Sequence, residues 1–121
     1  MRNSMLLFAA AALLAGPVQA QGAGPTAGVS AKGDGLWEIL CEYVADGELK
    51  TAILDASVTG FASPKLARME CRYRASANGD LTISVVGAES CPFAGAPAGA
   101  CNLTVPKSGR GRLKFTVAKT R

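Results

Sequence analysis

Cysteine is the residue type in this sequence best suited to chemistry, and four are present: Cys41, Cys71, Cys91 and Cys101. The sequence has no CxxC pair and no histidine, so it lacks both the closely spaced ligands of a zinc site and the motif of a thioredoxin-like redox site. A zinc site built from four distant cysteines is the less favoured interpretation. An even number of cysteines in a small exported chain indicates disulfides, and four cysteines allow three pairings.

Acid–base and nucleophilic catalysis lack their usual residues. Without histidine, Ser-His and Cys-His arrangements cannot form. Glu38 and Glu42 lie on one face of a predicted strand, roughly 13 Å apart, whereas a glycosidase pair needs less than about 10 Å. Ser108 beside Lys107 leaves Ser-Lys catalysis open, and no phosphate-binding glycine loop is present. We therefore predict a non-enzymatic protein without a cofactor, with an unrecognised kind of enzyme as the minor alternative.

Basic residues are the main surface signal. Loss of Arg2 with a signal peptide leaves 12 of the 13 Lys and Arg residues against nine Asp and Glu, a net charge of +3. This excess is too small to predict nucleic-acid binding. Either the basic residues form the soluble surface of a sheet, or they contact an anionic polymer, a lipid headgroup or an acidic partner. They form two clusters, Arg68, Arg72 and Arg74 in one, and Lys107, Arg110, Arg112 and Lys114 in the other.

A Pro/Gly/Ala-rich loop at 91–101 is the second candidate for partner binding. Phe93, flanked by Pro92 and Gly95, could be an exposed aromatic anchor on a rigid loop, which would lose little entropy on binding. The alternative is that Phe93 packs into the core. The predicted partner-binding residues are therefore Phe93, Lys107, Arg110, Arg112 and Lys114.

Alternation of apolar and polar residues predicts a mostly β fold. Residues 67–75 carry apolar side chains at odd positions and charged side chains at even positions, the pattern of a half-buried strand. Residues 81–86 alternate in the same way. A three-residue loop at 77–79 would join the two segments in a hairpin whose register places Cys71 opposite Val85.

Other segments extend the β pattern. Residues 36–44 alternate, and they place Cys41 on an apolar face with Trp37, Ile39 and Tyr43. Residues 48–58 fit either a helix or a strand, and the strand is favoured. The chain would end in a second hairpin around the turn PKSGRG. Five or six short strands at this spacing predict a small antiparallel sandwich or barrel.

The strand pattern also favours one disulfide pairing. Cys41 and Cys71 both lie on apolar faces, so a buried bridge between their strands is plausible. Cys91 and Cys101 enclose a short loop that their own bridge could close. We therefore predict Cys41–Cys71 and Cys91–Cys101.

The N-terminal region divides into two predicted segments. Residues 1–20 read as a signal peptide, with Arg2, an apolar stretch too short to span a bilayer, and small residues before a cleavage site after Ala20. Residues 21–35 are rich in glycine and predict a flexible leader. The folded β domain would then occupy 36–121.

One short resemblance to known proteins is present. The sequence GDGLWEILCE at 33–42 and the later AGAC at 98–101 resemble the start and the cysteine pattern of the invasion-associated locus B proteins, which are small secreted bacterial β proteins. The tetrapeptide GLWE is also similar to a group of uncharacterised periplasmic proteins. Neither resemblance implies a particular function.

These observations together predict a periplasmic or secreted binding or accessory module, such as a small inhibitor. Its expected partner is a protein of the cell envelope, and the alternative is anionic envelope material held by a basic surface. We expect neither a nucleic-acid partner nor a stable membrane span after cleavage of the signal.

Overall fold

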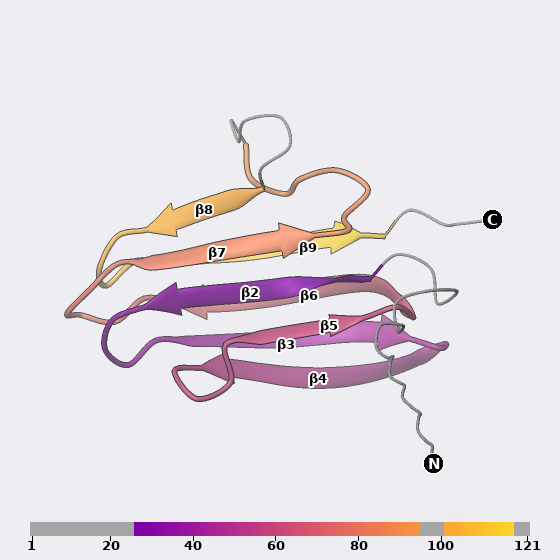
Figure 1. Ribbon diagram of the computed structural model, residues 1–121, viewed down its shortest axis with the longest axis horizontal. Coiled ribbons are helices and arrows are strands. Elements are labelled where there is room, and N and C mark those ends of the chain that lie inside the picture. Colours follow the sequence, from indigo (N-terminus) through magenta and orange to yellow (C-terminus); the bar gives the residue numbers. More distant parts are fainter. Residues whose placement is uncertain (1–25, 95–100, 118–121) are drawn as a thin grey trace, which may run out of the picture.

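The computed structural model describes residues 26–94 and 101–117, and this part of the chain contains strands and turns without a helix. The predicted signal peptide, 1–20, lies outside the described residues. The strands, with the labels of Figure 1, are β2 (Ala27–Gly33), β3 (Glu38–Ala45), β4 (Glu48–Asp55), β5 (Gly60–Ser63), β6 (Leu66–Arg74), β7 (Leu81–Val86), β8 (Asn102–Val105) and β9 (Arg110–Thr116).

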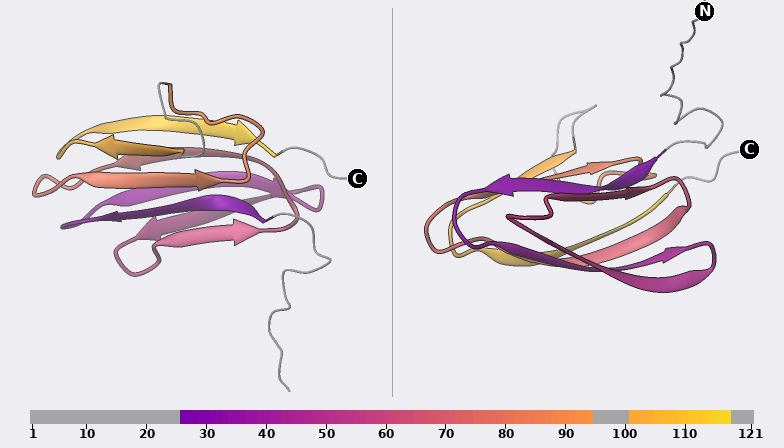
Figure 2. Two further views of the ribbon diagram at one scale, coloured as in Figure 1. Left: turned by 45° about the horizontal axis from the view of Figure 1, so that its top comes forward. Right: turned by 60° about the horizontal axis from the view of Figure 1, so that its bottom comes forward.

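The strands form two four-stranded antiparallel sheets that lie in two layers (Figures 1 and 2). One sheet has the strand order β5-β2-β7-β8 and the other has the order β4-β3-β6-β9. The all-β prediction is confirmed for the described residues, which contain eight strands where five or six were predicted, and the two layers fit the sandwich alternative. The segment left ambiguous at 48–58 contains a strand, as favoured.

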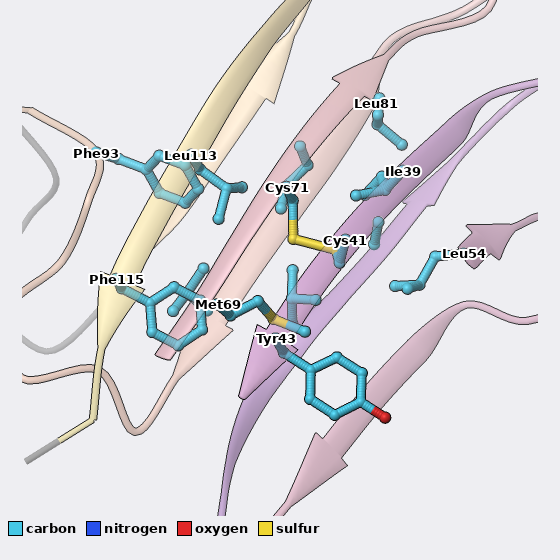
Figure 3. Close-up of a cluster of buried hydrophobic side chains, with 14 of the residues drawn as sticks. Ile39, Cys41, Tyr43, Leu54, Met69, Cys71, Leu81, Phe93, Leu113 and Phe115 are labelled. Carbon is cyan, nitrogen blue, oxygen red and sulfur yellow. A yellow bond between two sulfur atoms is a disulfide. The ribbon is translucent and has the colours of Figure 1, made fainter. Parts of the chain in front are cut away.

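Apolar side chains from both sheets form one core between the layers (Figure 3). The predicted inward faces are confirmed for 36–44 and for 69–75, because their odd-numbered apolar residues are buried or partly buried while most of their charged residues are exposed. Ala67 was also predicted to face inward, but it is exposed; the β3–β6 register shifts at this end of β6, and Leu66 is buried instead. The most completely buried large side chains come from both sheets: Ile39, Leu54, Met69, Leu81 and Ile83. Such burial contributes about 25 cal/mol per Å² of apolar surface, which is the main stabilising contribution in so small a protein.

Both predicted disulfides are present. Cys41 and Cys71 lie directly opposite each other on β3 and β6, with their Cα atoms 4.0 Å apart. Their bridge crosses the inner face of the sheet, and both residues are buried (Figure 3). Cys91 and Cys101 close the loop between β7 and β8. Two intramolecular disulfides indicate an oxidising, extracytoplasmic environment, and the described residues include no helix able to span a membrane.

Both predicted hairpins are wrong, for the same reason. β6 and β7 do not pair with each other; β6 pairs with β3 and β9, whereas β7 pairs with β2 and β8. Likewise, β8 and β9 lie in different sheets. Each connection is therefore an arch that carries the chain from one layer to the other. Alternation defines which face of a strand is buried, but two strands facing one core satisfy it equally well in one sheet or in opposite sheets.

The two arches stabilise each other through backbone hydrogen bonds. The Ala75 N–H donates to the Gly109 carbonyl over 2.8 Å, and the Ser108 N–H donates to the Ser76 carbonyl over 2.8 Å. The Lys107 N–H also donates to the Asp80 carboxylate over 3.1 Å. These bonds satisfy backbone groups that neither sheet can satisfy at this end of the molecule.

The prediction of a flexible leader over 21–35 is also wrong for its C-terminal half. β2 occupies Ala27–Gly33 and is a central strand, paired with β5 on one side and β7 on the other. Ala27, Val29 and Ala31 point into the core and are buried. The side chains of this segment are small, so its sequence contains little apolar surface and does not resemble a buried strand. Small side chains nevertheless suit a strand that is packed closely between two neighbours. The folded domain therefore begins before residue 36.

Substitution of Gly28 tests this correction. A Cβ atom at this position would lie 2.6 Å from the Ala62 Cα of β5 and would also collide with the Phe61 carbonyl oxygen. Gly28→Ala should therefore lower the free energy of unfolding by about 2 kcal/mol, as measured by urea denaturation. Lys32→Ala, at an exposed position of the same strand, should have little effect. Equal stability of the Gly28→Ala protein and the wild type would contradict the packed strand and support the original prediction of a flexible leader.

The two disulfides should differ in their contributions to stability. Cys41 and Cys71 are 30 residues apart in sequence, and Cys91 and Cys101 are 10 apart. Because a longer loop restricts the unfolded chain more, replacing the first pair by alanine should cost roughly 4 kcal/mol and replacing the second about 3 kcal/mol. Urea denaturation of the two double variants measures this order. A greater loss from the Cys91–Cys101 pair would contradict it.

Candidate functional site

The outer faces of the two sheets differ strongly in charge. On the sheet β5-β2-β7-β8, the outward-facing strand residues within the described ranges are small or uncharged apart from Lys32. The outer face of β4-β3-β6-β9 instead carries many charged side chains. A soluble surface alone does not require this asymmetry, and the charged face is therefore the candidate site.

Cross-strand register arranges four arginines as two opposed pairs on this face. β6 and β9 are antiparallel neighbours, and their partners include Arg72–Arg112 and Arg74–Arg110. All four residues are exposed. We call them the arginine quartet. The two pairs are separated by two residues along each strand, a distance of about 7 Å.

The local sequence of β9 keeps this strand in register with β6. Gly111 lies between Arg110 and Arg112 and faces the core, directly opposite Tyr73. A Cβ at position 111 would collide with the Tyr73 ring and hydroxyl. The missing side chain thus leaves room for Tyr73 to lie across β9, while Leu113 and Phe115 hold the rest of the strand against the core.

Most of the positive charge in the quartet is uncompensated. Arg74 lies 3.8 Å from the Glu38 carboxylate. Arg72, Arg110 and Arg112 form no ion pair with any described residue. Like charges directly opposite each other destabilise a sheet, so the fold maintains an arrangement that its own stability does not favour.

Apolar residues adjoin the quartet on the same face. Leu40 on β3 is the direct partner of both Arg72 on β6 and Ile53 on β4. These residues line a shallow groove of about 460 Å³, together with Arg112. A second groove, of about 300 Å³, shares Leu40 and the arginines and extends along the other pair of the quartet. The site therefore offers cationic and apolar surface side by side.

The residues predicted from sequence are only partly brought together. Arg110, Arg112 and Lys114 point outward from β9, where Lys114 lies opposite Glu70. Lys107 lies in the arch between β8 and β9, where its backbone N–H donates to the Asp80 carboxylate.

Phe93 is not the exposed anchor that the sequence predicted. It is buried, with 8% of its surface exposed, and belongs to the core. Phe93 lies two residues after the bridged Cys91, and its ring packs in the core near Leu113 and Phe115 (Figure 3). The alternative prediction, that Phe93 packs into the core, is therefore confirmed.

No protein-family model, curated protein or solved structure matches this chain. The short resemblance to the invasion-associated locus B proteins is therefore not supported by a family match. The function of the candidate site is inferred from its geometry.

One cross-strand pair on this face has like charges and a neighbouring pair has opposite charges, and this difference leads to a prediction for stability. Arg112 faces Arg72, whereas Lys114 faces Glu70 two residues further along the same strand. Arg112→Thr should therefore raise the free energy of unfolding at low ionic strength by about 0.5 kcal/mol, and Lys114→Thr should lower it by a similar amount. Both differences should shrink in 1 M NaCl, where charges are screened within roughly 3 Å. Urea denaturation at the two salt concentrations measures them, and equal signs for the two variants would contradict the interpretation.

Proposed function

We propose that this protein is a periplasmic or secreted binding module whose arginine quartet binds anionic groups of the cell envelope. The observation that carries the proposal is the direct opposition of two arginine pairs on one exposed face. The absence of ion pairs at Arg72, Arg110 and Arg112 among the described residues supports it, because these guanidinium groups are free to bind a ligand.

Arginine suits this role for chemical reasons. Its planar guanidinium group donates two parallel hydrogen bonds to the oxygens of a phosphate, sulfate or carboxylate, and it remains charged at all physiological pH values. Two opposed arginines can hold one such group between them. The second pair, about 7 Å further along the strands, offers the same chemistry to a second anionic group.

The interpretation as an inhibitor or as a module for a protein partner has less support. It depended in part on Phe93 as an exposed anchor, and that side chain is buried. An acidic protein segment could still use the quartet, since it presents the same carboxylate chemistry. The favoured partner is therefore anionic envelope material.

A polyanion tests the proposal. Arg72→Gln/Arg112→Gln should weaken binding to long-chain polyphosphate at least tenfold, as measured by isothermal titration calorimetry at 50 mM salt. Wild-type binding should also weaken steeply as salt rises, because exposed charges are screened. The control is Lys32→Gln/Lys107→Gln, which removes the same charge from exposed positions outside the quartet.

The control variant decides whether the quartet or the net charge is responsible. The control should bind polyphosphate almost as well as the wild type. If both double variants lost equal affinity, the binding would be a general effect of charge and the proposed site would be wrong.

A further inference from the structure

We infer that the anion bound by the quartet carries an apolar body, so that the ligand is a monomeric anionic amphiphile with a phosphate-like headgroup and a single short chain. This inference rests on the proposed function and deepens it. Its basis is the row of residues that crosses the sheet from β4 to β9.

Four directly paired residues form this row: Ile53, Leu40, Arg72 and Arg112. Neighbouring strands lie about 4.8 Å apart, so the row spans roughly 14 Å. Its first half is aliphatic and its second half is cationic. A ligand that lay along the row would therefore place an apolar chain over β3 and β4 and an anionic group between the two arginines.

The apolar half of the row is accessible. Ile53 is 56% exposed, and Leu40 is partly exposed. Both side chains line the 460 Å³ groove that also reaches Arg72 and Arg112. Covering these side chains removes apolar surface from water, so the chain of a ligand would add affinity beyond that of its headgroup.

Acidic residues on both sides of the row favour a single molecule over a membrane surface. Glu42 and Glu70 oppose each other on one side, and Asp55 and Glu38 do so on the other. A flat anionic bilayer laid on this face would bring its headgroups against these carboxylates, and like charges repel. Glu42 and Glu70 line the same groove as the row, so a narrow ligand contacts one of these acidic pairs rather than both. The P–OH group of a monoprotonated phosphate would donate a hydrogen bond to these carboxylates while its other oxygens bind the arginines.

Two probes with the same headgroup separate the contributions. Isothermal titration calorimetry with n-octyl phosphate, below its micelle-forming concentration, and with methyl phosphate compares an anion with and without a chain. We expect n-octyl phosphate to bind the wild type at least tenfold more tightly. Ile53→Ser should abolish most of this difference while leaving the affinity for methyl phosphate unchanged.

Val86→Ser is the matched control for Ile53→Ser. Val86 is 55% exposed, like Ile53, but it lies on the outer face of the other sheet. The control should retain the full preference for n-octyl phosphate. Because both substitutions are at exposed positions, both proteins should fold, which urea denaturation verifies. Equal loss of the preference in the two variants would overturn the inference.

The remaining outcomes separate this inference from the proposed function. Equal affinity of the wild type for the two phosphates, with polyphosphate binding intact, would overturn the amphiphile and leave the anion site standing. Binding to phosphatidylglycerol vesicles without a preference for n-octyl phosphate would assign the face to a membrane and also overturn it. Failure to bind any of these probes would overturn both proposals.

Discussion

The pairing of β3 with β6 is the constraint on which the core and the candidate site both depend. These strands are the central members of their sheet, and the Cys41–Cys71 bridge joins them at directly opposed residues. In a strand, successive side chains point to opposite faces, so a shift of one residue would turn every buried side chain outward. The bridge excludes such a shift. The same register that places Cys71 in the core places Arg72 beside Leu40 on the outer face.

The sequence predicted the faces of the strands well because burial has a direct signature. Alternation in 67–75 identified Met69 and Cys71 as inward-facing and Arg72 as outward-facing. It could not identify the neighbours of a strand, since strands on opposite sides of one core show the same alternation. Both supposed hairpins are arches for this reason. β2 escaped detection because Ala27 and Ala31 have too little apolar surface to stand out among glycines.

For the candidate site, too, the sequence predicted which residues face outward but not which strands lie next to each other. Both basic clusters were visible as outward-facing residues, and the disulfide pairing followed from the apolar positions of Cys41 and Cys71. The sequence did not show that the two basic clusters lie side by side. Arg72 and Arg112 are about forty residues apart, and only the pairing of β6 with β9 brings them together. The contribution of Leu40 and Ile53 required the register of three strand pairs. Phe93 was misjudged because a loop rich in Pro and Gly gives no sign of whether its aromatic residue turns inward.

The strand order also has a kinetic consequence. Most neighbours in the two sheets are distant in sequence; within each sheet, only β3–β4 and β7–β8 are consecutive strands. A topology of this kind has a high contact order and folds slowly, because long loops must close before their contacts form. Cys91 and Cys101 are close along the chain and can meet early, whereas Cys41 and Cys71 meet only when β3 and β6 have found each other. The Cys41–Cys71 bridge therefore forms only once the sheet has assembled, while the Cys91–Cys101 bridge can form in a chain that is still largely unstructured.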